Sequence, residues 1–384
     1  MKPPKRHVST NQTPNSHFQP PKTGDKPKVK RGRHRVSNNG LSVSSARPFI
    51  IPVFLPHAGC PHQCVFCNQV LITGIKQNTV RPDQFRRQIR QFLEYKKKDR
   101  KPVQIAFFGG TFLGLKQEEI KSWLELAGEF VSQGLVDSIR FSTRPDTIDD
   151  ARLDLLENYP VATVELGVQS MDDHVLALVR RGHSAADTVR AVEKLKTRRV
   201  AIGLQMMVGL PGEDESSALA SARAITGLQP DFVRIYPTLV IENSPLAQWY
   251  RQGDYAPLSL ESAVRRVAII YQLFSSCNIP VIRMGLQASR DLDDGATIVA
   301  GPYHPAFGHL VYSALFLKTA RDALTSCMPF NSKVTLTVHP QSISRMRGLK
   351  NANIFTLTND FDITSIDVVA DAGLAQDELQ ISIP

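Results

Sequence analysis

The chain has 384 residues, of which 42% are hydrophobic, and its formal net charge at pH 7 is +10. A chain of this length and composition can bury one large core or two of ordinary size. Its polar start has no apolar core of a secretory signal, and no apolar run reaches the about 18 residues of a membrane span, so we expect a cytoplasmic protein without a membrane partner.

The positive charge is concentrated in residues 1–47, which contain eleven Lys or Arg and one acid, Asp25. This segment alone accounts for the net charge of +10. It is rich in Pro, Ser, Asn and Gln and poor in large apolar residues, a composition typical of disorder. We expect a disordered basic tail that binds tRNA or another RNA electrostatically, or one that only increases solubility. A mitochondrial transit peptide is a third interpretation, disfavoured because prolines oppose an amphipathic helix.

From residue 48 to 289 the sequence alternates short β-branched runs with longer amphipathic runs. The predicted strands are 49–55, 103–108, 138–143, 161–168, 200–208, 232–236 and 279–283. The predicted helices are 82–97, 117–133, 149–157, 172–181, 185–197, 214–227 and 260–276. Such alternation indicates an α/β fold with parallel strands, either as a closed or partial barrel or as a doubly wound sheet. In a barrel the active site lies where the strands end.

Three of the five cysteines lie in a short loop after the first predicted strand: Cys60, Cys64 and Cys67. Thiolates at this spacing are typical of an iron–sulfur cluster, and three of them leave one iron of a [4Fe–4S] cubane open to another ligand. The alternative is a structural zinc site, for which His57 or His62 could supply the fourth ligand. Disulfides are less favoured, because the thiols are odd in number and clustered in a long enzyme-like chain.

With Phe66 before the last cysteine, the loop reads C-x3-C-x-aromatic-C and resembles the cluster loop of the radical S-adenosylmethionine (SAM) superfamily. The resemblance implies a partial (βα)6 TIM-type barrel that binds a [4Fe–4S] cluster and SAM. In that family the open iron chelates SAM, and an electron from the cluster cleaves SAM to a 5′-deoxyadenosyl radical. The resemblance also implies an electron donor of the flavodoxin or ferredoxin type.

The ends of the next two predicted strands carry further segments that resemble this family. Gly109, Gly110 and Thr111 match its glycine motif, whose backbone binds the amino group of SAM, although two glycines alone usually indicate only a turn. The segment 141–146 resembles the E-T-R-P-D run of the Elongator catalytic subunit, with Ser142 in the place of the Glu that contacts SAM. Ser142 is therefore a candidate SAM contact that departs from the family pattern.

Later strand ends extend the resemblance. Gln169, and Arg181 twelve residues further on, match residues that contact SAM in related enzymes, where an amide suits ribose hydroxyls and a guanidinium suits the methionine carboxylate. Met206 is similar to the apolar residues that flank the adenine, although it or Met207 could be a core residue. Tyr236, in an I-Y-P-T-L-V run of Elongator type, is a candidate catalytic residue. The simpler interpretations are a solvated helix end for Arg181 and a half-buried aromatic for Tyr236.

Residues 290–384 predict a small α+β C-terminal extension, with a helix near 309–326 and a β-rich run from 332 to 340. His304 is a second candidate catalytic residue, because histidine exchanges protons near neutral pH, although single histidines are more often structural. The expected domains are the tail (1–47), the barrel (48–289) and the extension (290–384). The extension shows no recognisable acetyl-CoA-binding signature.

We therefore expect a radical SAM enzyme of the Elongator-like branch, with a tRNA base as the leading substrate. One alternative is a porphyrin-related or other small molecule, as in relatives of oxygen-independent coproporphyrinogen oxidase. Another is a protein that binds the cluster and SAM as a carrier, or that binds RNA, without turnover.

Overall fold

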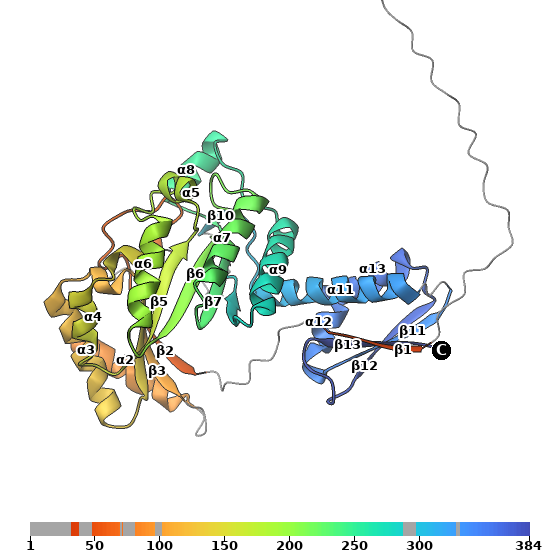
Figure 1. The fold of residues 1–384 in the computed structure, drawn as a ribbon, viewed down its shortest axis with the longest axis horizontal. Coiled ribbons are helices and arrows are strands. Elements are labelled where there is room, and N and C mark those ends of the chain that lie inside the picture. Colours follow the sequence, from red (N-terminus) through yellow and green to blue (C-terminus); the bar gives the residue numbers. More distant parts are fainter. Residues whose placement is uncertain are drawn as a thin grey trace, which may run out of the picture.

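The computed structural model describes residues 32–37, 48–69, 71, 81–96, 102–286, 297–327 and 331–384. Its larger part is a curved sheet of seven parallel strands in chain order, with helices on the outer side (Figure 1). The strands are β2 (Phe49–Leu55), β3 (Val103–Gly109), β4 (Ser138–Thr143), β5 (Val161–Gln169), β6 (Ala201–Val208), β7 (Phe232–Pro237) and β9 (Val281–Met284). The sheet ends at β2 and β9, which do not pair with each other, so the expected partial barrel is confirmed.

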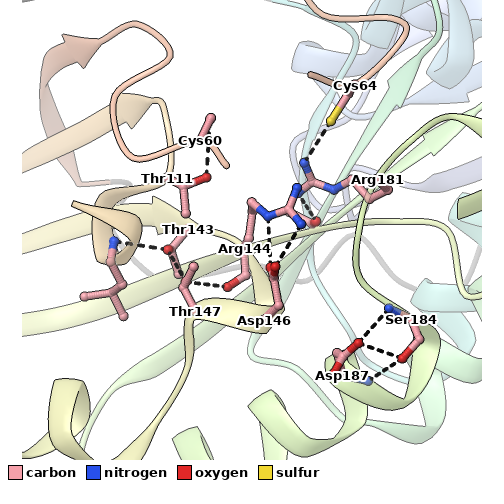
Figure 2. A network of polar contacts seen from close by, with 12 residues as sticks. Cys60, Cys64, Thr111, Thr143, Arg144, Asp146, Thr147, Arg181, Ser184 and Asp187 are labelled. Atoms are coloured by element: carbon pink, nitrogen blue, oxygen red, sulfur yellow. Dashed lines mark hydrogen bonds and ion pairs between the residues drawn. The ribbon is translucent and has the colours of Figure 1, made fainter. Parts of the chain in front are cut away.

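Helices follow the strands along the chain, as the alternating pattern predicts. They are α2 (Pro82–Glu94), α3 (Gln117–Ser132), α4 (Asp150–Leu156), α5 (Asp173–Leu178), α6 (Ala185–Lys196), α7 (Glu215–Gly227), α8 (Pro245–Gln252) and α9 (Leu260–Ser276). The start of α6 is fixed by a reciprocal cap. The Ser184 hydroxyl accepts a hydrogen bond from the Asp187 amide at 3.2 Å, and the Asp187 carboxylate accepts one from the Ser184 amide at 2.7 Å (Figure 2). This cap satisfies two amides that have no partner within a helix.

The two faces of the barrel sheet differ in polarity, because side chains alternate along each strand. The outer face carries residues such as Ile105, Val164 and Leu204, which belong to the main hydrophobic core. Burying one such side chain stabilises the fold by roughly 1.5–3 kcal/mol. The inner face carries polar residues, among them Glu165 and Gln205. The polar side chains of the sheet that could bind a ligand therefore lie inside the half-barrel.

A second sheet of four strands has the order β1-β13-β11-β12. Its strands are β1 (Gly32–Ser37), β11 (Lys333–Val338), β12 (Ser365–Ala370) and β13 (Glu378–Ile383), and it is accompanied by α12 (Ile343–Arg347) and α13 (Ala352–Asp360). The expected α+β extension is thus confirmed. β1 corrects the expectation that all of 1–47 is disordered, because its backbone pairs antiparallel with β13. The rest of that tail lies outside the described residues.

One long helix, α11 (Phe307–Cys327), connects the two parts (Figure 1). Its first half contributes Val311 and Leu315 to the barrel core, and its second half contributes Phe316 and Leu324 to the core of the second sheet. This one helix therefore packs against both hydrophobic cores. The expected domain boundary near residue 290 falls in a segment outside the described residues.

A short antiparallel pair, β8 (Val240–Ile241) and β10 (Ile298–Ala300), completes the strands. Nowhere in the described residues does a helix combine the length and the apolar character that crossing a membrane requires.

Candidate active site

A cavity of about 230 Å³ lies where the barrel strands end, next to the cysteine loop. It is bordered by the ends of strands that are far apart in the sequence. The expected site residues that line it are Cys60, Cys64, Cys67, Gly109, Gly110, Thr111, Ser142, Gln169, Arg181 and Tyr236. The fold thus brings the motifs of separate strand ends together around one space.

The glycine motif holds the cysteine loop against β3. The Gly110 amide donates to the Leu55 carbonyl at 2.8 Å, and the Thr111 amide donates to the Ala58 carbonyl at 2.7 Å. A Cβ atom on Gly110 would lie only 2.0 Å from the Ala58 carbonyl oxygen. No larger residue fits here without moving the loop, so Gly110 serves the placement of the thiols as well as any contact with SAM.

The three thiols share one environment. The pKa of Cys67 is raised to about 12, first by burial and then by the proximity of Cys64 and Cys60. Cys60 Sγ lies 3.4 Å from the Thr111 hydroxyl (Figure 2). Iron binding deprotonates a thiol outright. Three thiols that line one cavity fit the three protein ligands of a cluster with an open iron.

The structure gives little support to a mononuclear zinc site. His57 Nε2 accepts a hydrogen bond from the Gln69 amide at 3.1 Å, so this nitrogen is already engaged. The ring of His62 lies against Gly182, whose added Cβ would be 2.3 Å from His62 Cδ2. Within the described ranges, no three His, Cys, Asp or Glu side chains are grouped closely enough to hold a single metal ion.

Arg181 connects the thiol loop to the end of β5. Its Nη1 donates to Cys64 Sγ at 3.4 Å, and its Nη2 donates to the Gly167 carbonyl at 2.5 Å (Figure 2). The residue is only 8% exposed, so it is not a solvated helix end. Its Nε is buried and finds no hydrogen-bond partner in the described part of the chain. A buried guanidinium with an unused donor is suited to an anionic ligand.

Gln169 lies beside this arginine at the end of β5. It has a positive φ of 69°, and its Oε1 accepts a hydrogen bond from Gln205 Nε2 at 3.2 Å. A Cβ atom on Gly167 would lie 2.7 Å from Arg181 Nη2 and 2.9 Å from Gln169 Nε2. Gly167 is therefore required for both side chains to occupy these positions.

A second arginine, Arg144, lines the same cavity and was missed in the sequence analysis as a site residue. Its Nε and Nη2 each donate to the Asp146 carboxylate at 2.9 Å, and its side chain is 2% exposed. Nearby, burial and then the charges of Arg181 and Arg144 lower the pKa of His183 to about 3. His183 is therefore neutral at neutral pH, and the positive charge of this region belongs to the two arginines.

Glu165 and Gln205 were also missed, although both line the cavity. The alternation of side chains between the two faces of each strand could have identified both residues. Glu165 lies two residues before Gly167 on β5, and therefore on the same face as this cavity-lining glycine. Gln205 lies two residues before Met207, which also lines the cavity.

The structure corrects two expected positions. Met206 is 1% exposed and packs in the main core on the outer face, whereas Met207, next along β6, faces the cavity. Alternation along the strand decides between two equally apolar neighbours. His304 does not line the cavity, and its Nδ1 accepts a hydrogen bond from the Ala306 amide at 3.0 Å near the start of α11. Tyr236 does line the cavity, as expected.

Two family models match this chain. The radical SAM superfamily matches residues 54–225, and the radical SAM C-terminal domain matches residues 230–316. An uncharacterised protein of Methanocaldococcus jannaschii is 30% identical over 220 residues, which cover 55% of this chain and 67% of that protein.

A curated tRNA acetyltransferase and a solved structure named Elp3 are also similar to this chain. The tRNA uridine(34) acetyltransferase of Methanocaldococcus infernus is 27% identical over 316 residues, covering 72% of this chain and 58% of that protein. A structure of Elp3 from the same organism, with residues 1–46 deleted, has a TM-score of 0.53 and 23% identity, over 71% of this chain and 63% of the other. That structural likeness concerns the fold alone.

The chain thus spans little more than half the length of the acetyltransferase relative. The superfamily model covers the thiols and Arg181, and the C-terminal model covers the strands that follow. The expected cofactors follow from the family. The chain belongs to the radical SAM superfamily, whose enzymes use a [4Fe–4S] cluster and SAM, and it is similar to the Elongator-like branch of that superfamily.

Proposed function

We propose that Cys60, Cys64 and Cys67 hold a [4Fe–4S] cluster, that SAM binds beside it, and that the chain is a radical SAM enzyme acting on a base in tRNA. The observation that carries the proposal is the placement of Arg181, which reaches from the Cys64 sulfur to the Gly167 carbonyl. One side chain thereby connects the cluster ligands with the strand end on which SAM would lie. When bound, the cluster supplies the electron for reductive cleavage of SAM.

The residues around Arg181 can orient SAM by its separate groups. The guanidinium offers positive charge to the methionine carboxylate, since its Nε has no partner among the described residues. The amides of Gln169 and Gln205 support each other and suit ribose hydroxyls. At Gly109 and Gly110 no side chain prevents the backbone from approaching the amino group. Ser142 also lines the cavity, and its hydroxyl is available there to contact SAM.

The adenine would lie against apolar side chains of the cavity lining. Met207, Leu239 and Ile241 belong to this lining, and all three are buried. Such a surface excludes water from one side of the ligand, which protects a reactive intermediate from side reactions. We therefore assign to Met207 the adenine contact first expected for Met206.

A reductant must reach the cluster from outside. Pro61, His62 and Gln63, between the first two cysteines, are exposed. This short surface next to the thiols supports docking of a small donor of the flavodoxin or ferredoxin type.

Two observations support tRNA as the substrate. The relatives that match over much of the barrel carry the name tRNA uridine(34) acetyltransferase, and residues 1–47 contain eleven Lys or Arg. Positive segments of this kind bind nucleic acid through its phosphates. A small-molecule substrate remains the second candidate, because a cavity of about 230 Å³ also suits a small ligand.

The test combines two measurements. Anaerobically reconstituted protein with dithionite and SAM should release 5′-deoxyadenosine, and nucleosides of tRNA from cells with and without the gene should differ by one modification. Release of 5′-deoxyadenosine with unchanged tRNA nucleosides would favour the small-molecule alternative. SAM binding without cleavage would favour the carrier.

A further inference from the structure

The inner wall of the half-barrel holds an ionic cluster around Glu165, to which the proposed function assigns no role. Glu165 Oε1 lies 3.3 Å from Arg140 Nη1, and Glu165 Oε2 lies 2.8 Å from Arg234 Nε. The side chains of Arg140 and Glu165 are 7% and 4% exposed, and that of Arg234 is 14% exposed. Two guanidinium groups thus share one carboxylate, which leaves an excess positive charge inside the barrel.

Arg283 adds a third guanidinium to the same wall. It is the register partner of Arg234 on the neighbouring strand β9, and partners in a parallel pair share a face. Arg283 is half-buried and no described carboxylate forms an ion pair with it; its guanidinium makes one long hydrogen bond, from Nε to the Gly285 carbonyl at 3.4 Å. A half-buried arginine without a carboxylate partner among the described residues, next to a second arginine on the neighbouring strand, is suited to bind an oxyanion.

Aromatic rings lie next to this charge. Phe108 is half-buried, its ring centroid is 6.2 Å from that of Phe54, and the guanidinium carbon of Arg234 lies 5.4 Å from the Phe108 centroid. Arg234 Nη1 also donates to the Tyr236 hydroxyl at 3.3 Å, and Tyr236 lines the cavity. Rings beside cations provide stacking for a base and a contact for its phosphate.

We propose that this inner wall binds one nucleotide of the substrate, with its phosphate on Arg283 and Arg234 and its base on the Phe54 and Phe108 rings. Arg234 then connects the phosphate site to Tyr236 at the cavity. The inference rests on the proposed tRNA substrate and adds where the nucleotide is recognised. The phosphate belongs either to an RNA chain or to a free nucleotide, and the probes below separate these sources.

The experiment measures binding to the reconstituted full chain with three probes: uridine 5′-monophosphate, uridine and a single-stranded RNA oligomer. Wild type should bind the monophosphate about tenfold more tightly than uridine, as one charge-assisted contact provides. Arg283→Gln should remove this preference, and Arg283→Lys should restore most of it. The control is Arg265→Gln, because Arg265 is 69% exposed on α9 and pairs with Glu215. This control should leave the preference unchanged.

For the oligomer, Arg283→Gln should reduce the slope of log K against log salt by about 0.7, the value for one lost phosphate contact on a single strand. Retained preference in Arg283→Gln, or equal wild-type affinity for uridine and its monophosphate, overturns the inference. Binding of the oligomer with no dependence on Arg283 also overturns it, while leaving the proposed function intact. A phosphate preference lost with Arg283, together with unchanged tRNA nucleosides in cells, supports this site and rejects tRNA as the substrate.

Discussion

The Gly110 amide donates a hydrogen bond to the Leu55 carbonyl at 2.8 Å, so the end of β3 is joined to the start of the cysteine loop. We expect Gly110→Ala to bind far less iron, because its Cβ would lie 2.0 Å from the Ala58 carbonyl oxygen and would displace the loop. The measurement is iron content after anaerobic reconstitution.

A matched glycine provides the control. Gly128, in α3, has no atom within 4 Å of an added Cβ. Gly128→Ala should bind iron normally and be more stable by roughly 0.5–1 kcal/mol, because alanine favours a helix. Normal iron content in Gly110→Ala would show that the loop does not depend on this contact.

The cysteines should separate into two groups. Replacing Cys60, Cys64 or Cys67 by Ala should abolish the brown colour of the reconstituted protein and the binding of about four irons per chain, because each supplies one cluster ligand. Cys277→Ala should keep both, since Cys277 is exposed on the far end of α9. Stoichiometric zinc with no iron uptake in wild type would contradict the cluster assignment.

Arg181→Ala should weaken SAM binding by about 1.5–3 kcal/mol, the value of a charge-assisted hydrogen bond. The neighbouring Arg180→Ala is the matched control, because Arg180 is exposed and does not line the cavity. Equilibrium binding of SAM to both reconstituted variants decides the matter. Equal affinities would show that Arg181 serves the loop and not the ligand.

Glu213 should give folding stability a distinct pH dependence. It accepts hydrogen bonds from the Gly209 amide at 2.7 Å and from Arg266 at 3.2 Å, yet burial raises its pKa from 4.5 to about 7. The folded state therefore holds this proton more tightly than the unfolded state does. The resulting stabilisation is fully present below pH 4.5 and is lost as the pH rises to about 7.

Comparison with Glu213→Gln isolates this effect from other titrating groups. Between those pH limits, the free energy of unfolding of wild type relative to the variant should fall by about 3 kcal/mol, at 1.36 kcal/mol per pKa unit. Chemical denaturation of both proteins across the pH range measures it. A difference that does not change with pH would mean that Glu213 has the same pKa in the folded and unfolded states.

The basic tail is tested by deleting residues 1–31, which removes eight Lys or Arg and one acid. This deletion preserves β1 and its pairing with β13. Cluster loading and SAM cleavage should be unchanged, whereas affinity for tRNA should fall and become less salt-dependent, since each lost phosphate contact reduces the slope. Equal affinities and equal slopes for both forms would identify the segment as a solubilising extension.

The sequence predicted the barrel and the thiol loop because both depend on local patterns. Strand and helix periodicity persist over whole elements, and Cys60 and Cys67 lie close together in the chain itself. The choice between Met206 and Met207 could not be predicted, because both are apolar and the face that each occupies depends on the register of β6 with its neighbours.

Two further features could not be predicted from local sequence patterns. β1 reads GRHRVS, a polar and basic run without strand-like alternation, and its pairing is with β13 at the other end of the sequence. The ionic cluster at Glu165 needs side chains from three strands, which only the folded sheet brings together.

The pairing of β1 with β13 also sets an order of events during synthesis. Ser37 lies opposite Glu378, so β1 emerges from the ribosome long before its partner strand exists. At translation rates of about 5–20 residues per second, the delay is on the order of tens of seconds. The barrel, whose strands pair with their neighbours in chain order, can form in that interval. The second sheet, in contrast, cannot close until β13 has been synthesised, because β1 pairs with that strand.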